Sequence, residues 1–121
     1  MADLRDYTSL RVGGPAKKFV EVGTEAEIIA AIETAGESPI LIIGSGTNIL
    51  VSDTGFEGTV IRIVNHSLQA EVDACSGATL TIGAGENWDD FVKTTLERGF
   101  AGLETLSGIP GSVGAAPIQN I

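Results

Sequence analysis

The stretch IIGSGTNILVSD, residues 42–53, contains the residue types that proteins use to bind phosphate groups. Two glycines, a serine, a threonine and an asparagine stand between two apolar runs. Glycines let the backbone present N–H groups to a ligand at close range, and small hydroxyls add further donors. The second apolar run, Ile49 to Val51, has the composition of a strand. The stretch therefore predicts a phosphate-type loop with no helix behind it.

The two common phosphate-binding motifs fit this stretch poorly. The dinucleotide fingerprint requires a third glycine at the position of Ile49 and then a helix. A Walker loop requires Gly-Lys-Ser/Thr, and no lysine lies between Lys18 and Lys93. A tight turn between two strands needs only the glycines and the asparagine. The spacing alone leaves both the binding loop and the simple turn open.

A second glycine-rich stretch, residues 102–120, reads GLETLSGIPGSVGAAPIQN. Gly108, Gly111 and Gly114 recur at every third position, so the backbone can approach a flat or charged ligand closely. The alternative is an ordered loop that packs beneath another segment. A long loop without secondary structure is uncommon in a compact domain unless it has a function, so we favour a binding role.

The composition limits which ligands these loops could hold. The chain has 121 residues, 43% of them hydrophobic, and a net charge of −9 with only seven Lys and Arg. Nucleic-acid binding is excluded, because it requires clustered cations. Any phosphate must therefore be held by backbone N–H groups and hydroxyls. We expect no membrane span, no signal peptide and no metal site. Cys75 is expected to be a half-buried strand residue.

The first half of the chain has the pattern of a strand–helix–strand unit within residues 18–43. Strands are expected at Lys18–Val22 and Ile40–Ile43. Thr24 and Glu27 form a capping box for the helix between them, and Gly36 is placed to end it. The two strands are expected to be parallel, joined by a right-handed crossover. The inner face of the helix is expected to comprise Ile28, Ile29 and Ile32.

The second half is expected to form a mainly antiparallel sheet with a helix. After a strand at Thr59–Val64, a hairpin is predicted across Ser76-Gly77, between residues 70–75 and 78–82. A helix follows from Asn87 to Gly99, with an inner face of Trp88, Phe91, Val92, Thr95 and Leu96. The fold class is α+β. We expect one subdomain at residues 1–65 and the start of a second at 66–121.

Three stretches together resemble one protein family. "SLRVGGPA", "IIGSGTNILVSDTGFEGTVI" and above all "GLETLSGIPGSVGAAPIQNI" are similar to the N-terminal half of the UDP-N-acetylenolpyruvoylglucosamine reductases, from about Tyr7 to Ile121. The resemblance implies the FAD-binding fold of vanillyl-alcohol oxidase, also called the PCMH type, in truncated form. It implies FAD as cofactor and NADPH as co-substrate. The implied reaction reduces UDP-N-acetylglucosamine enolpyruvate to UDP-N-acetylmuramate in bacterial peptidoglycan synthesis.

The resemblance also assigns roles to the two stretches. Gly44 to Asn48 would cradle the FAD pyrophosphate with backbone N–H groups, and Ser107 to Asn120 would line the isoalloxazine and ribityl portion. A valine at Gly46 should then abolish flavin binding and leave the fold largely intact. The implied FAD-binding residues are Gly44, Ser45, Gly46, Thr47, Asn48, Ile49 and Leu50, and then Ser107, Pro110, Gly111, Ser112, Gly114, Ala115, Ala116, Ile118, Gln119 and Asn120.

The family continues beyond the length of this chain, and its catalytic residues lie in that continuation. We therefore expect no catalytic residue here, no substrate domain, no activity of the chain alone, and nucleotide-sugar binding only in the complete enzyme. Self-association through an open sheet edge and a bacterial cytoplasmic location are further expectations. Two alternatives remain: an FAD-binding module of another oxidoreductase with the same fold, and a small structural domain without a ligand.

Overall fold

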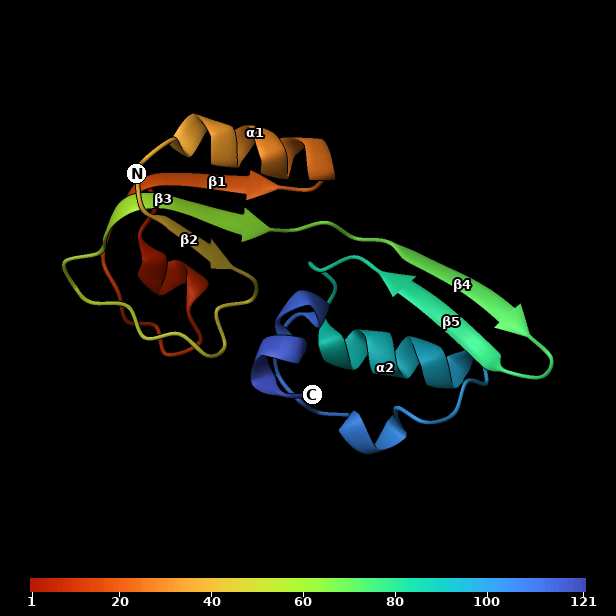
Figure 1. Cartoon of the computed structure of the whole chain (residues 1–121). Coiled ribbons are helices and arrows are strands. Elements are labelled where there is room, and N and C mark those ends of the chain that lie inside the picture. The colour runs from red at the N-terminus through yellow and green to blue at the C-terminus, as the bar shows by residue number, and fades with distance from the viewer.

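The computed structural model describes all 121 residues, arranged as two sheets with a helix packed on each (Figure 1). The first sheet contains β1 (Ala16–Val22), β2 (Ile40–Ile43) and β3 (Phe56–Ile63), and the second contains β4 (Leu68–Asp73) and β5 (Gly77–Ile82). The α-helices are α1 (Glu25–Ala35) and α2 (Trp88–Glu97). Four short 3-10 helices complete the chain: η1 (Leu4–Tyr7), η2 (Glu104–Leu106), η3 (Val113–Ala115) and η4 (Pro117–Gln119). The predicted α+β class is confirmed.

The first sheet is parallel, with the strand order β1-β3-β2. The predicted strand–helix–strand unit is present, but β3 lies between its two strands and pairs with both. Val60 and Ile61 of β3 are completely buried, as expected for the central strand of a sheet that is covered on both faces. The strand order depends on pairings between distant segments, which the local pattern does not contain.

Helix α1 begins as predicted but buries a different face. The Thr24 hydroxyl accepts a hydrogen bond from the Glu27 N–H at 3.2 Å, and the Glu27 carboxylate accepts one from the Thr24 N–H at 3.2 Å. Of the expected inner face, Ile28 is half-buried, whereas the expectation is wrong for Ile29 and Ile32, which are 50% and 43% exposed. Small residues of α1 face β1 instead, across a groove lined by Ala30, Ala31, Thr34 and Ala35.

The N-terminal segment covers the other face of the first sheet. Leu4 is 1% exposed and packs with Ala16, Ile43 and Val60 in one core cluster. The Tyr7 ring lies on the Phe19 ring of β1, with the centroids 4.4 Å apart. Burying a leucine-sized side chain stabilises a fold by about 2 kcal/mol, so the first residues of the chain are part of the core.

The hairpin of the second sheet turns slightly earlier than predicted. Strands β4 and β5 pair from Leu68–Ile82 to Asp73–Gly77, and the turn is Ala74-Cys75-Ser76. The Asp73 carboxylate accepts the N–H groups of Cys75 and Ser76, at 2.7 and 3.0 Å, and so defines the turn. Cys75 is therefore exposed, and its expected half-buried strand position is wrong.

Helix α2 forms the second core cluster. Asn87 caps it by accepting the Asp90 N–H at 3.0 Å, and Gly99 follows its end with a φ of 78°. Of the predicted inner face, Trp88, Phe91, Val92 and Thr95 are buried, whereas Leu96 is 47% exposed. The helices are too short and too polar to cross a lipid bilayer.

Candidate functional site

The loop Gly44–Asn48, here called the cradle loop, follows β2 directly. No helix stands behind it, as predicted, but the strand expected at Ile49–Val51 is absent. Ile49 and Val51 pack against the first core cluster instead, and the next strand starts only at Phe56. The pattern alone does not distinguish the two cases, because packing against a core requires the same apolar residue types as a β-strand.

The backbone N–H groups of the cradle loop have no partner in the protein. None from Gly44 to Asn48 donates a hydrogen bond to another protein atom, and the N–H groups of Gly111 and Ser112 are also unpaired. Backbone N–H groups are nearly always paired once they leave bulk water. Consecutive free N–H groups in a turn form a concave nest that binds anions. The cradle loop therefore has the donors that a phosphate group requires.

Gly46 gives the cradle loop its shape. It is buried, has a φ of 67°, and accepts the Ser9 N–H at 3.0 Å through its carbonyl group. A Cβ atom at this position would collide with the Tyr7 carbonyl oxygen. Glycine is therefore required at position 46 because the backbone there lies close to the N-terminal segment. The expectation that a valine at Gly46 would leave the fold largely intact is wrong.

Within the second glycine-rich stretch, the part from Ser107 to Asn120 lies along the segment that leads into α2. The Gly111 carbonyl accepts the Trp88 N–H at 2.9 Å, and the N–H groups of Val113 and Gly114 donate to Glu86 and Ala84 at 2.8 and 3.0 Å. The Trp88 indole N–H also donates to the Leu106 carbonyl at 2.9 Å. The stretch is thus an ordered sequence of turns and short 3-10 helices, placed by backbone hydrogen bonds.

Asp89, in the first turn of α2, holds Ser107 and Gly108 in place through hydrogen bonds. Its carboxylate accepts the Gly108 N–H at 2.6 Å and the Ser107 hydroxyl at 3.0 Å. These two donors, the Gly108 N–H first, hold the pKa of Asp89 below its usual value, since they stabilise the charged form. Ser107 was expected to contact a ligand, but its hydroxyl donates a hydrogen bond to the Asp89 carboxylate instead.

The two glycine-rich stretches meet at two adjoining hollows, where the blue C-terminal turns approach the first sheet in Figure 1. A Cβ atom at Gly44 would collide with the Ser112 hydroxyl, and one at Gly111 would lie 3.2 Å from the Thr47 hydroxyl. One hollow, of about 170 Å³, is lined by residues 42–49 with Ala115, Ile118 and Gln119. The other, of about 140 Å³, is lined by Ile42, Ile43, Gly44, Ile63, Ala84, Ser112, Gly114, Ala115 and Ile118.

The structure brings together most of the residues that the sequence singled out. Six of them line neither hollow: Leu50, Ser107, Pro110, Gly111, Ala116 and Asn120. Leu50 is 79% exposed, and Ala116 is buried against α2 in the second core cluster. Ile42, Ile43, Ile63 and Ala84 line the hollows but were not predicted. The glycines on either side of Ala84, Gly83 and Gly85, were the signal that could have indicated that position.

The polar side chains of the hollows are free to bind. Ser45, Thr47, Asn48 and Gln119 make no side-chain hydrogen bond within the protein, and no lysine or arginine lines either hollow. No group of three or more His, Cys, Asp or Glu side chains is arranged to hold a metal ion. The arrangement suits a ligand whose phosphates accept hydrogen bonds from the backbone and whose remaining atoms contact small apolar residues.

Comparison with known proteins decides which ligand class this is. The FAD binding domain family matches residues 16–121.

The chain belongs to the FAD-binding domain family.

The related proteins carry one name. UDP-N-acetylenolpyruvoylglucosamine reductase of Cutibacterium acnes is 48% identical over 98% of this chain, and that of Streptomyces coelicolor is 44% identical over 99%. The crystal structure of the corresponding reductase from Thermus caldophilus aligns with a TM-score of 0.71 and 34% identity over 95% of this chain. The chain covers 32% and 30% of the two bacterial relatives and 39% of the solved structure, and so spans about a third of their length.

The residues of this FAD-binding domain fit the cofactor. Free N–H groups of the cradle loop match the acceptor oxygens of a pyrophosphate, and the unpaired Gln119 and Asn48 amides can bond a ribityl chain or flavin ring. Each hollow is smaller than the roughly 300–1,000 Å³ of a complete ligand site. They match the size of parts of FAD rather than of the whole molecule.

Replacing Gly46 with alanine should destabilise the FAD-binding domain by at least about 2 kcal/mol, because alanine is strained at this φ and its Cβ overlaps the Tyr7 carbonyl group. Gly99→Ala is the matched control, since Gly99 has a φ of 78° but no atom within 4 Å of an added Cβ. The control should lose only about 1 kcal/mol. Urea unfolding measures both. Equal losses would show that the contact with Tyr7 does not matter.

Asp89→Asn should lower the stability of the domain at neutral pH, because a neutral amide is a weaker acceptor for Gly108 and Ser107. The folded-state pKa of Asp89 is depressed, so its contribution is present above the unfolded-state pKa and is lost as pH falls through the folded value. The difference between the two proteins should therefore shrink below about pH 4.

Asp90→Asn, in the same helical turn, controls for the charge at the N-terminus of α2. Thermal unfolding across a pH series is the measurement. A difference between wild type and Asp89→Asn that persists unchanged at low pH would contradict the role given to the Asp89 carboxylate.

Proposed function

We propose that this chain is the FAD-holding part of a reductase that uses NADPH to reduce UDP-N-acetylglucosamine enolpyruvate to UDP-N-acetylmuramate. The observation that carries the flavin assignment is the row of unpaired N–H groups in the cradle loop, which faces the second glycine-rich stretch across one pair of hollows. The substrate assignment rests on the name shared by the relatives, which also favours this reductase over another oxidoreductase of the same fold.

The cradle loop would hold the pyrophosphate without a cation. Its N–H groups lie next to the hydroxyls of Ser45 and Thr47, so several neutral donors can share the negative charge. This arrangement suits a chain with a net charge of −9, in which few lysines and arginines are available. The apolar side chains of Ile42 and Ile118 would exclude water from part of the ligand.

The second stretch would hold the flavin end of the cofactor. Gly114 lines the smaller hollow and packs closely on Ala84, where a Cβ atom would collide, and Gln119 adds an amide at the edge of the larger hollow. When bound, FAD supplies the hydride chemistry between NADPH and the enolpyruvyl group. We assign no catalytic residue to this chain. Its role is to bind the cofactor and to orient it.

The proposal assigns the two parts of the FAD site to two subdomains of the chain. Residues 1–65 form the first FAD-binding subdomain, which contributes the cradle loop, and residues 66–121 contribute the second stretch. The separate core clusters, one around Leu4 and Val60 and one around Trp88 and Phe91, support this division. The relatives are bacterial proteins, and the free thiol of Cys75 is compatible with a reducing cytoplasm, where we place the chain.

Gln119→Ala should weaken FAD binding by about 2- to 10-fold, the usual effect of losing one neutral hydrogen bond. Gln69→Ala on β4, an exposed position away from both hollows, should bind FAD as the wild type does. Titration followed by flavin fluorescence measures both affinities, in the 121-residue chain and in a longer protein that contains it. Saturable binding that is equally strong in both variants would remove Gln119 from the site, and the absence of FAD binding in the longer protein would refute the function.

A further inference from the structure

A polar hollow lies beside the cradle loop but outside the proposed flavin site. It has a volume of about 340 Å³ and shares only Ser45 with the two hollows described above. We call it the N-terminal hollow. It is lined by Asp6, Tyr7, Thr8, Ser9, Arg11, Ser45 and Arg62.

Two of the seven cationic residues of this acidic chain meet at the N-terminal hollow. Arg62 is held in place by an ion pair of 2.6 Å between its Nη1 and Glu21, and its guanidinium lies 5.3 Å from the centre of the Tyr7 ring. Glu21 engages one nitrogen of the guanidinium and leaves other N–H donors available. Arg11 makes no ion pair.

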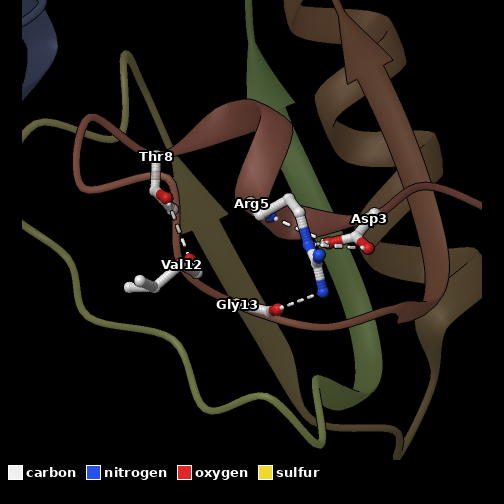
Figure 2. A network of polar contacts seen from close by, with 5 residues as sticks. All are labelled: Asp3, Arg5, Thr8, Val12 and Gly13. Carbon is white, nitrogen blue, oxygen red and sulfur yellow. Dashed lines mark hydrogen bonds and ion pairs between the residues drawn. The ribbon is translucent and has the colours of Figure 1, made fainter.

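The backbone around Arg11 is held in an unusual conformation. Arg11 has a φ of 55°, in the left-handed region that residues other than glycine avoid, and such strain is concentrated at functional sites. Figure 2 shows the hydrogen bonds that maintain the segment: the Thr8 hydroxyl donates to the Val12 carbonyl at 2.9 Å, and the Arg5 guanidinium donates to the Gly13 carbonyl at 3.4 Å. The hollow is therefore bounded by a segment with its own internal bonds.

The remaining donors of the hollow are unused. The hydroxyls of Tyr7, Ser9 and Ser45 make no hydrogen bond within the protein. Two guanidinium groups and three hydroxyls that line one hollow match the oxygens of a phosphate group in charge and in the number of donors. Asp6 on the rim opposes an anion, so binding should be weakened by its carboxylate.

From this geometry we infer that the N-terminal hollow binds the phosphate group of a small molecule, at a site separate from the flavin site. The inference goes beyond the proposed flavin function and does not depend on it. The phosphate could be free or carried by a nucleotide, since both present the same oxygens to Arg11 and Arg62.

The test is a titration of the ¹⁵N-labelled chain with inorganic phosphate, followed through the amide signals of Ser9 and Arg11, which line the N-terminal hollow and neither of the other two. Arg11→Gln should weaken binding by at least about fivefold, since it removes a charge-assisted contact. Asp6→Asn should strengthen binding, a change that partial unfolding could not produce. Arg98→Gln and Asp90→Asn make the same charge changes on or next to α2 and should have no effect. Added sodium chloride should weaken binding throughout.

Equal phosphate affinity in Arg11→Gln and Arg98→Gln, or weaker binding in Asp6→Asn, would overturn the inference. A parallel titration with ADP distinguishes the sources: tighter binding than phosphate, still dependent on Arg11, indicates a nucleotide, and equal binding indicates free phosphate. Phosphate shifts that persist in the presence of saturating FAD support a separate site. Shifts that FAD abolishes would place the hollow within the flavin site and overturn the separation. If FAD does not bind to the chain, the phosphate affinities of the Arg11→Gln and Asp6→Asn variants alone decide whether the inference holds.

Discussion

The candidate site depends on one backbone contact, the approach of Gly46 to the carbonyl group of Tyr7. Gly46 is buried against the N-terminal segment in a conformation that only glycine adopts readily, and its carbonyl group satisfies the Ser9 N–H. With its backbone turned this way, the cradle loop makes no hydrogen bond through its own N–H groups. A loop that used these groups in a strand ladder or a helix could not offer them to a phosphate. The N-terminal segment therefore shapes the candidate site without lining either of its hollows.

The second half of the site is placed by the segment around the start of α2. The carbonyl groups of Ala84 and Glu86, the Trp88 N–H and the Asp89 carboxylate form hydrogen bonds that hold the second glycine-rich stretch between Gly108 and Gly114. Gly111 and Ser112 are thereby brought against Thr47 and Gly44. Helix α2 contributes through its packing and its capping region, so its apolar stripe is core, and none of its residues lines either hollow.

The features that the sequence predicted well are those with a local chemical cause. The Thr24–Glu27 capping box and the start of the second helix at Asn87 each depend on only a few adjacent residues. The position of β3 between β1 and β2 was not predictable from local pattern, since parallel pairing joins segments far apart in the chain. Ile29 and Ile32 have helical spacing but remain exposed, because small residues of α1 face the sheet. The local sequence patterns located the helices and strands, whereas contacts between distant segments determine how these pack.

The same distinction applies to the candidate site. Glycine spacing was enough to single out both stretches, but it could not show that they meet or that Gly46 is required by Tyr7 rather than by a ligand. Ala84 and Ile63 were not predicted, because the sequence does not distinguish an apolar residue that lines a hollow from one that is buried in a core. The ligand class came from resemblance to known flavoproteins, which the residue types alone did not supply.

The central claim is that the free N–H groups of Gly44 to Asn48 bind the pyrophosphate of FAD. Amide chemical shifts of the ¹⁵N-labelled chain test it most directly, in parallel titrations with FAD and with riboflavin, which has the same ring system but no phosphate. The account predicts large shifts of the Gly44–Asn48 amides with FAD and little change of these amides with riboflavin. FAD binding that leaves these amides unmoved, or riboflavin shifts of equal size, would contradict it.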